Sequence, residues 1–178
     1  YGVADGNEVS ISGEKLMTVI NNIYNFNSLL SPLLRVQANP DLIENFICCD
    51  LASPDAFSSE NLEETAHLFI EHMADQETSG KWSVGEIDYE NGSFEAVSRK
   101  RGILRKTVIN RDILASSLLQ KLLMSEEYDV VGYFQKEVNA RLVLNEHSYP
   151  IRNVSGFIDA ISEIGRSRID RISRFKGL

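Results

Sequence analysis

The 178-residue sequence has little of what marks fibrous, disulfide-rich or membrane-spanning chains. Its 11 glycines and 4 prolines are too few for a collagen-like repeat or a low-complexity linker. The only two cysteines, Cys48 and Cys49, are adjacent and make no disulfide framework, which fits a reducing cytoplasm. No apolar run reaches the roughly 18 residues that span a bilayer, and the acidic, polar start does not look like a signal peptide. We therefore expect a cytoplasmic globular protein without membrane contact.

Basic residues are scarce in the first half of the chain and abundant in the second. Residues 1–98 hold three bases and 17 acids, a net charge of −14, whereas residues 99–178 hold 15 bases and nine acids, a net charge of +6. Five bases fall within eight positions, namely Arg99, Lys100, Arg101, Arg105 and Lys106. Because charges more than about 8 Å apart are largely screened at physiological salt, local sign matters more than the total. The second half can therefore bind a polyanion, unless these charges form an ordinary solvated face.

The spacing of apolar residues predicts helices in the first part of the chain. Apolar positions recur at helical spacing from Ser12 until Pro32, which ends or kinks the helix. Asn39 and Pro40 form a cap and first turn that open a short helix through Cys48. A third helix is predicted to open at Ser58 or Ser59 and to end before Gly80.

The period then changes to that of strands. Residues 81–90 and 93–101 flank Asn91-Gly92, a strong hairpin signal, and residues 103–109 follow as a further strand. Trp82 and Tyr89 have rings that can stack on bases, but aromatic residues in strands are more often part of the core. Asn110 is predicted to cap a helix.

The end of the chain is predicted to alternate again between strand and helix. Residues 141–144 form a short strand that leads to a turn at Tyr149-Pro150, and Ser155 caps the last long helix. Residues 171–175 alternate as a final strand. The fold class is thus a compact α+β domain with several amphipathic helices, a hairpin and short strands.

Candidate catalytic and metal-binding groups have the wrong spacing. His67 and His72 are five residues apart on a predicted helix, whereas a zinc helix needs histidines four apart. The adjacent glutamates at 63–64 and 126–127 point in different directions on helices, so they are not acid–base pairs. No glycine-rich phosphate loop is present. The residues therefore predict no catalytic group, no metal ligand and no cofactor-binding site in this chain.

The last seven residues, I-S-R-F-K-G-L from Ile172 to Leu178, carry a family resemblance. They resemble the opening of the R-[YF]-K-G-L-G-E-M motif near the end of the TOPRIM metal-binding domain of type IIA topoisomerases, where a helix and a strand precede it. The rest of the chain resembles the insertion that many Gram-negative DNA gyrase B subunits carry before this motif. The resemblance implies that residues 1–150 are the insert domain and residues 151–178 the C-terminal part of TOPRIM. The chain then reads as a piece of a longer protein.

The resemblance also implies a function. Gyrase uses ATP to pass one DNA duplex through a double-strand break in another and so introduces negative supercoils; two A and two B subunits form the enzyme. The ATP site and the acidic Mg²⁺ ligands of the family match nothing in this chain, so the fragment alone is expected to be inactive and without cofactor. The implied partners are DNA and the gyrase A subunit, at the nucleoid in the cytoplasm.

Seven residues are the candidate DNA contacts. The family match places Arg174 and Lys176 near the DNA backbone, and the density of cations at 99–106 adds Arg99, Lys100, Arg101, Arg105 and Lys106. Two alternatives stay open. The chain is then either an unrelated α+β protein-interaction module or part of the B subunit of topoisomerase IV.

Overall fold

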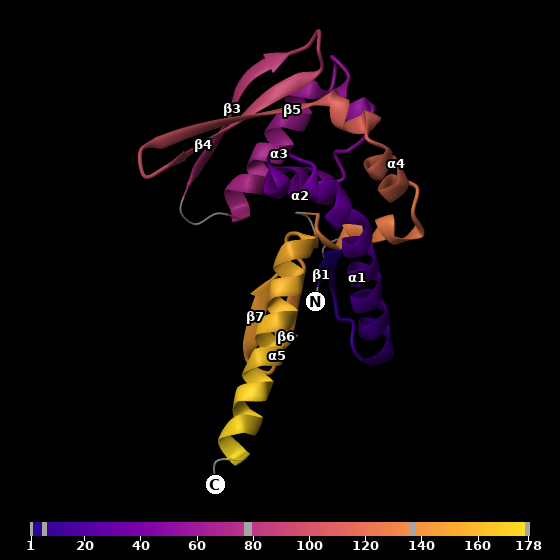
Figure 1. The fold of residues 1–178 in the computed structure, drawn as a ribbon, viewed down its shortest axis with the longest axis vertical. Coiled ribbons are helices and arrows are strands. Elements are labelled where there is room, and N and C mark those ends of the chain that lie inside the picture. Colours follow the sequence, from indigo (N-terminus) through magenta and orange to yellow (C-terminus); the bar gives the residue numbers. More distant parts are fainter. Residues whose placement is uncertain (1, 5–6, 77–79, 136–137, 177–178) are drawn as a thin grey trace.

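The computed structural model has the mixed α+β fold that the sequence predicts (Figure 1). It describes residues 2–4, 7–76, 80–135 and 138–176, with side chains for 9–76, 80–135 and 138–166. The α-helices are α1 (Gly13–Arg35), α2 (Pro40–Cys48), α3 (Leu62–Gln76), α4 (Ser117–Leu123) and α5 (Val154–Lys176). Short 3₁₀ helices are η1 (Asp55–Phe57), η2 (Arg111–Ala115) and η3 (Glu126–Tyr133). The strands are β1 (Gly2–Ala4), β2 (Asn7–Val9), β3 (Lys81–Asp88), β4 (Ser93–Lys100), β5 (Ile103–Asn110), β6 (Arg141–Leu144) and β7 (His147–Pro150).

The main sheet is antiparallel in the order β3-β4-β5, so the predicted hairpin and the strand after it are confirmed. The β3–β4 connection runs from Tyr89 to Gly92. The Asp88 carboxylate accepts hydrogen bonds from the backbone N–H of Glu90 and of Asn91 at 3.1 and 3.0 Å. Gly92 has a φ of +62°, and a Cβ there would lie 3.2 Å from the Phe57 carbonyl oxygen. The tight turn therefore needs glycine at this position.

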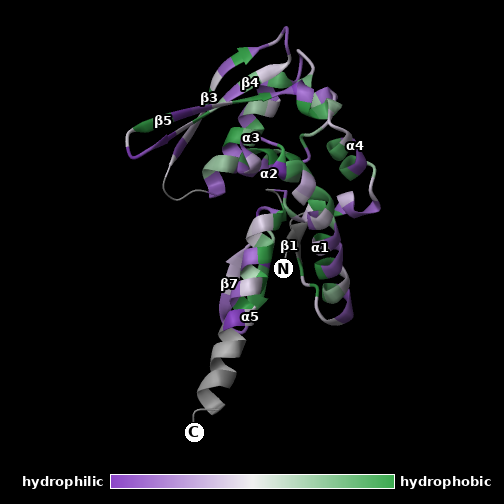
Figure 2. Cartoon of the chain, in the orientation of Figure 1, coloured by the Kyte–Doolittle hydropathy of each residue, from purple (hydrophilic) through white to green (hydrophobic). Residues whose placement is uncertain are grey.

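Aromatic rings form the core between α2, α3 and one face of the sheet. The ring of Phe46 in α2 lies 5.5 Å from the rings of Phe69 and Phe57 and 6.3 Å from that of Phe94. All residues of α2 from Leu42 to Cys48 are buried, and Figure 2 shows this helix mostly in hydrophobic colours. Cys48 is fully buried, and burial raises the pKa of its thiol, so it packs as a protonated apolar group.

A network of polar side chains fastens the start of α5 to this core. Glu44 is buried in α2, and its carboxylate accepts hydrogen bonds from the N–H and the hydroxyl of Ser155 at 2.6 and 2.5 Å. The Asn45 side-chain oxygen accepts from Gln76 at 2.8 Å and from Asn153 at 3.0 Å. Burial raises the pKa of Glu44, and the hydrogen bonds from Ser155 oppose that rise. The start of α5 thus shares the core of the preceding residues, and a domain boundary at residue 150 stays a prediction.

The end of the chain differs from the sequence prediction. The alternation at 171–175 predicts a strand, but α5 continues as a helix through Lys176, so that prediction is wrong. A strand needs a neighbour to satisfy its backbone hydrogen bonds. No strand within the described residues pairs with this segment. The helix satisfies the same groups within the segment itself.

Smaller differences concern helix starts and one turn. Residues 58–61 form a turn ahead of α3, which begins at Leu62. The side chain of Asn110 does accept a hydrogen bond as a cap, from the N–H of Asp112, but it opens the 3₁₀ helix η2, and Ser116 caps α4 separately. Tyr149 and Pro150 belong to β7 rather than to a turn. Among the residues described, no helix combines the length and the apolar character needed to cross a membrane.

Candidate nucleic-acid interface

The β4–β5 turn gathers the five clustered cations at one end of the sheet. Lys100 pairs with Ile103 across the two strands, which leaves a connection of two residues, Arg101 and Gly102. Their φ angles of +51° and +80° are both positive, as in the type I′ turns that match the twist of a hairpin. All five cations are exposed to solvent. The run that the sequence marks as basic is therefore a projecting hairpin end, seen at the far side of the sheet from α4 in Figure 1.

The pleat of the sheet divides these cations between its two faces. Successive side chains of a strand point to opposite faces. Lys100 and Arg105 lie on the face that looks toward α2, where they line a cleft. Arg99 and Lys106 lie on the opposite face, and Arg101 occupies the turn. Two otherwise similar pairs of cations are thus available on the two faces.

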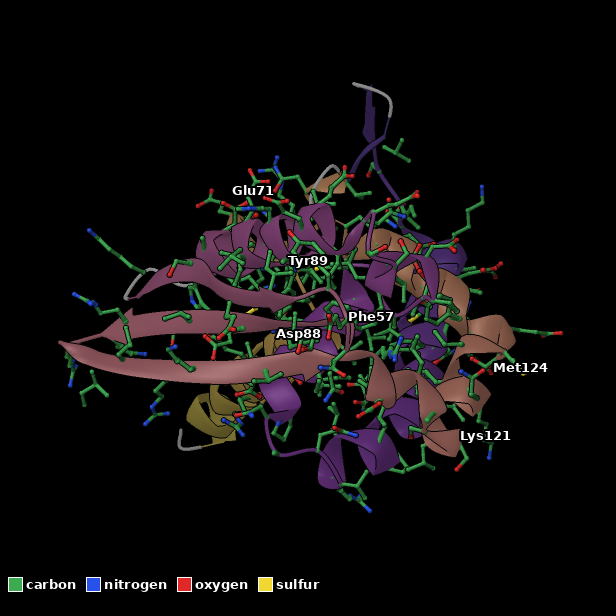
Figure 3. All side chains as sticks on the ribbon, turned by 90° about the horizontal axis from the view of Figure 1, so that it is seen from above. Phe57, Glu71, Asp88, Tyr89, Lys121 and Met124 are labelled. Carbon is green, nitrogen blue, oxygen red and sulfur yellow. The ribbon has the colours of Figure 1, made fainter. Side chains whose placement is uncertain are left out.

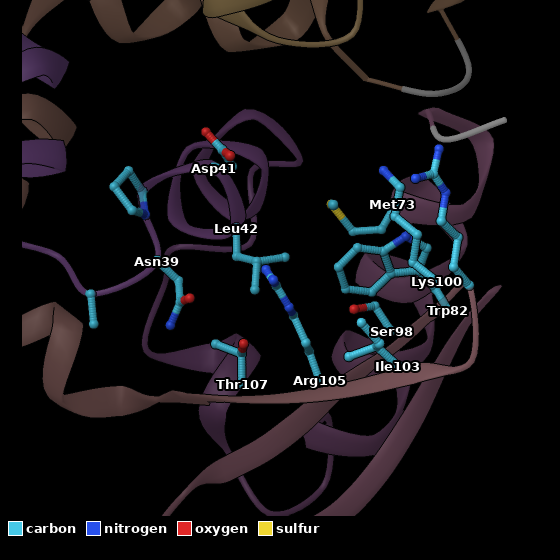
Figure 4. Close-up of a pocket in the computed structure, with 13 residues that line it drawn as sticks. Asn39, Asp41, Leu42, Met73, Trp82, Ser98, Lys100, Ile103, Arg105 and Thr107 are labelled. Atoms are coloured by element: carbon cyan, nitrogen blue, oxygen red, sulfur yellow. The ribbon is translucent and has the colours of Figure 1, made fainter. Parts of the chain in front are cut away.

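The cleft has a volume of about 600 Å³ and lies between the hairpin end and the start of α2 (Figure 4). The ring of Trp82 lies in it between Met73 and Ser98, and Arg105 reaches from β5 toward Leu42. Six of the residues that line it matter most for its chemistry: Leu42, Met73, Trp82, Ser98, Arg105 and Thr107. The cleft therefore combines an aromatic surface, hydroxyl groups and positive charge.

The cations differ in how far the protein already neutralises them. The Lys106 ammonium forms an ion pair with the Glu95 carboxylate at 2.9 Å, and this hydrogen bond lowers the pKa of Glu95. No hydrogen bond or ion pair to another described residue engages the side chains of Arg99, Arg101 or Arg105. These three guanidinium groups are the ones free to meet an anionic ligand.

Trp82 has an unsatisfied polar atom. Its indole Nε1 is buried and has no hydrogen-bond partner in the described part of the chain. A buried donor without a partner costs about 1–3 kcal/mol. The sequence allowed Trp82 either a role in the core or a role in stacking on bases. In the structure one part of the side chain packs on the core and another part lines the cleft.

The other predicted contacts lie elsewhere or are not described. Arg174 and Lys176 are in α5, and their side chains fall outside the described residues. The structure therefore brings together Arg99, Lys100, Arg101, Arg105 and Lys106 only.

The histidines do not combine into a site. His67 is exposed, whereas His72 is buried with its Nε2 2.5 Å from the Gln76 side-chain nitrogen. Glu63 accepts a hydrogen bond from the Tyr89 hydroxyl at 3.3 Å. Within the described residues, no group of three or more His, Cys, Asp or Glu side chains is placed to hold a metal ion.

Sequence reasoning missed the walls of the cleft. Strand alternation at Ser98, Lys100, Arg105 and Thr107 was a usable signal for one wall, because these residues share a face. The opposite wall comes from the start of α2 and the end of α3, and no local pattern foretells that contact. The chain matches no protein-family model and no curated protein sequence.

Proposed function

We propose that this chain is a non-catalytic DNA-binding segment of a DNA gyrase B subunit, whose ATP site and Mg²⁺ ligands lie outside it. Together with the A subunit, the complete enzyme introduces negative supercoils into DNA. The observation that carries the DNA-binding part is the projecting β4–β5 turn, where three guanidinium groups have no partner among the described residues. The segment then helps to hold DNA and couples it to both kinds of subunit.

The physical basis is neutralisation of phosphates. Lysine and arginine side chains that contact DNA phosphates release condensed counterions, which gives affinity that is independent of sequence and sensitive to salt. A projecting turn reaches a DNA backbone without bringing the acidic helix α3 close to it. Glu63, Glu64, Glu71 and Asp75 are exposed on α3, so repulsion restricts DNA to the side of the turn.

The gyrase assignment is supported by the order of the elements. The features through which the sequence resembles the insertion are, in order, a helix, a helix opened by Asn39-Pro40, an acidic helix, a hairpin and a strand–helix pair. The chain has α1, α2, α3, the β3–β4 hairpin and β5 followed by α4 in the same order. The motif letters at 172–178 are the second support, although residues 171–176 belong to helix α5 where the family pattern has a strand.

The first experiment measures duplex binding by the 178-residue chain. A fluorescein-labelled 30-base-pair duplex is titrated at several salt concentrations and followed by anisotropy. The variant Arg99→Gln/Arg101→Gln/Arg105→Gln should lower the steepness of the log Kd against log salt plot, by about 0.9 for each phosphate that is no longer neutralised. The matched control Lys15→Gln/Arg35→Gln/Lys121→Gln removes three exposed charges away from the turn; Figure 3 shows Lys121 at the opposite side of the molecule. An equal slope in all three proteins rejects DNA binding at the turn.

The second experiment tests the place of the segment in gyrase. The same triple variant is introduced into the full-length B subunit, which is then combined with the A subunit to form the enzyme. Supercoiling and DNA-stimulated ATP hydrolysis should fall, while ATP hydrolysis without DNA stays close to normal. Loss of the basal hydrolysis as well would contradict a role limited to DNA binding and coupling.

A further inference from the structure

The cleft beside the basic turn has two kinds of surface that a DNA duplex does not use together. One is aromatic and apolar, made by Trp82 with Met73 and Leu42. The other is cationic, made by Lys100 and Arg105 on neighbouring strands of the same face. A ligand that fills the cleft must therefore carry a flat apolar group and a negative charge a short distance apart.

The size of the cleft limits the ligand further. Its volume of about 600 Å³ is in the range of small-ligand pockets, roughly 300–1,000 Å³. In a duplex each base is already stacked on both sides, so its ring face is not available to Trp82. In a single strand the base can turn out, stack on an aromatic side chain and leave its phosphate to a nearby cation.

We propose that the cleft binds an unpaired nucleotide of single-stranded nucleic acid, with the base against Trp82 and the phosphate against Arg105 and Lys100. This inference rests on the proposed function, because duplex binding and nucleotide binding both use the basic end of the β4–β5 hairpin. It assigns single-stranded nucleic acid, rather than a duplex, to the inner face of the sheet, which looks toward α2. Arg99, on the face of β4 that points away from the cleft, then contacts a duplex alone, whereas Arg101 and Arg105, which line the cleft, are shared by the two kinds of ligand.

The donors of the cleft favour a nucleotide over an acidic peptide. The hydroxyls of Ser98 and Thr107 line the cleft beside the ring of Trp82. Base edges carry carbonyl and ring-nitrogen acceptors that suit such donors. A glutamate-rich segment would pair with the cations but has no flat ring to stack on the indole of Trp82.

Trp82 supplies the measurement, because it is the only tryptophan of the chain. The full 178-residue chain is titrated with the oligonucleotide dT6 at low salt while the Trp82 fluorescence is recorded. Stacking of a base on the indole should quench the emission, with saturation. The blunt 30-base-pair duplex of the first experiment, which stays paired at low salt, should bind without quenching, as followed by the anisotropy of its label.

Two variants on opposite faces give the matched comparison. Arg105→Gln removes one of the cations that line the cleft and should weaken dT6 binding about tenfold, as for the loss of one charge-assisted hydrogen bond. Arg99→Gln removes an exposed cation on the outer face of β4 and should change dT6 binding less than about twofold, the size expected of a screened surface charge. Trp82→Leu, measured by anisotropy of labelled dT6, should weaken binding about 5- to 150-fold, the range for one base–aromatic stack. Circular dichroism and thermal melts check that each variant is folded.

The outcomes separate this inference from the proposed function. Duplex binding with no quenching by dT6 overturns the nucleotide cleft and leaves the DNA-binding turn. Quenching by dT6 without duplex binding supports the cleft and overturns the turn as a duplex contact. Equal weakening by Arg99→Gln and Arg105→Gln overturns the assignment to the inner face. Equal quenching by poly-glutamate overturns the nucleotide ligand in favour of an acidic peptide.

Discussion

The two ends of the three-stranded sheet share one register but have opposite environments. At one end Phe94 and Ile109 face each other and are each 1% exposed. At the other end Ile103 is 63% exposed and Leu104 49% exposed, beside the basic turn. Helices α2 and α3 pack against the first end, whereas the second projects past them as a hairpin (Figure 1).

This difference separates stability from binding along one pair of strands. Burying a large apolar side chain contributes about 1.5–3 kcal/mol, so the packed end holds the strands in register. The backbone hydrogen bonds between β4 and β5 continue without a shift to the projecting end, so that end has the same register. Its side chains are then presented in a defined order, and Arg99, Arg101 and Arg105 have no partner among the described residues.

The largest effect is expected from a change at the packed end. Phe94→Ala should lower the free energy of unfolding by about 3–5 kcal/mol, because it removes a buried ring and leaves a cavity between Phe46 and Phe69. Ile103→Ala at the projecting end should change it by less than about 0.5 kcal/mol, as for surface substitutions. Urea unfolding followed by circular dichroism measures both. A similar loss of unfolding free energy in Phe94→Ala and Ile103→Ala would contradict the difference between the two ends of the sheet.

The next effect concerns the polar network that joins α2 to the start of α5, and it depends on pH. Glu44→Ala should cost about 1–3 kcal/mol, because the Ser155 donors lose their acceptor. Because the folded pKa of Glu44 is raised above its usual value of 4.5, the folded state keeps a proton that the unfolded chain has released. The stability linked to this group is therefore present at low pH and falls as the pH rises through 4.5 and up to the raised pKa.

Glu44→Gln serves as the control for that pH dependence. Glutamine keeps an oxygen to accept from the Ser155 N–H but does not titrate, so its unfolding curves should lack the decline above pH 4.5. The midpoints of urea unfolding are measured between about pH 3 and pH 8 for the unsubstituted chain and for Glu44→Gln. A decline of the same size in Glu44→Gln would assign the pH dependence to other groups.

A smaller effect, of opposite sign, is expected at the projecting turn. Arg101 has a φ of +51°, a conformation that side chains other than Gly, Asn and Asp adopt at a cost. Arg101→Asn should therefore raise the free energy of unfolding by about 0.5–1 kcal/mol while weakening duplex binding. Arg101→Ala is the control, since it removes the charge without relieving the backbone, and thermal melts with duplex titrations measure both properties. A gain in stability with Ala as large as with Asn would contradict the backbone explanation.

The smallest effect is expected from the ion pair on the outer face. The Lys106 side chain is 56% exposed, so its pair with Glu95 is largely screened by solvent. Glu95→Gln should leave the urea midpoint within experimental error but should strengthen duplex binding at low salt, because it frees the Lys106 ammonium. Unchanged duplex binding would mean that Lys106 lies outside the DNA interface. Together with the Phe94 and Arg101 variants, stronger duplex binding at an unchanged midpoint would show that the packed end of the sheet determines stability and the projecting end determines affinity for DNA.

Local signals were the reliable part of the prediction. The helix opened by Asn39-Pro40 and the hairpin around Asn91-Gly92 depend on neighbouring residues, and both are present. The segment 171–175 shows the limit of such signals, because its alternation suits a strand but a strand requires a partner from elsewhere in the fold. The same holds for the cleft, whose two walls lie far apart in the sequence.

The sequence by itself determined the content of the candidate site: five cations within eight residues and a single tryptophan at the start of the preceding hairpin. It also determined the turn, since Gly102 next to Arg101 allows a connection of two residues. Only the tertiary structure decided which cations lie on the same face as Trp82. It also decided that the start of α2 forms the opposite wall of the cleft. The reason is physical: strand alternation sorts side chains onto two faces, but long-range packing of apolar helices decides which face is covered.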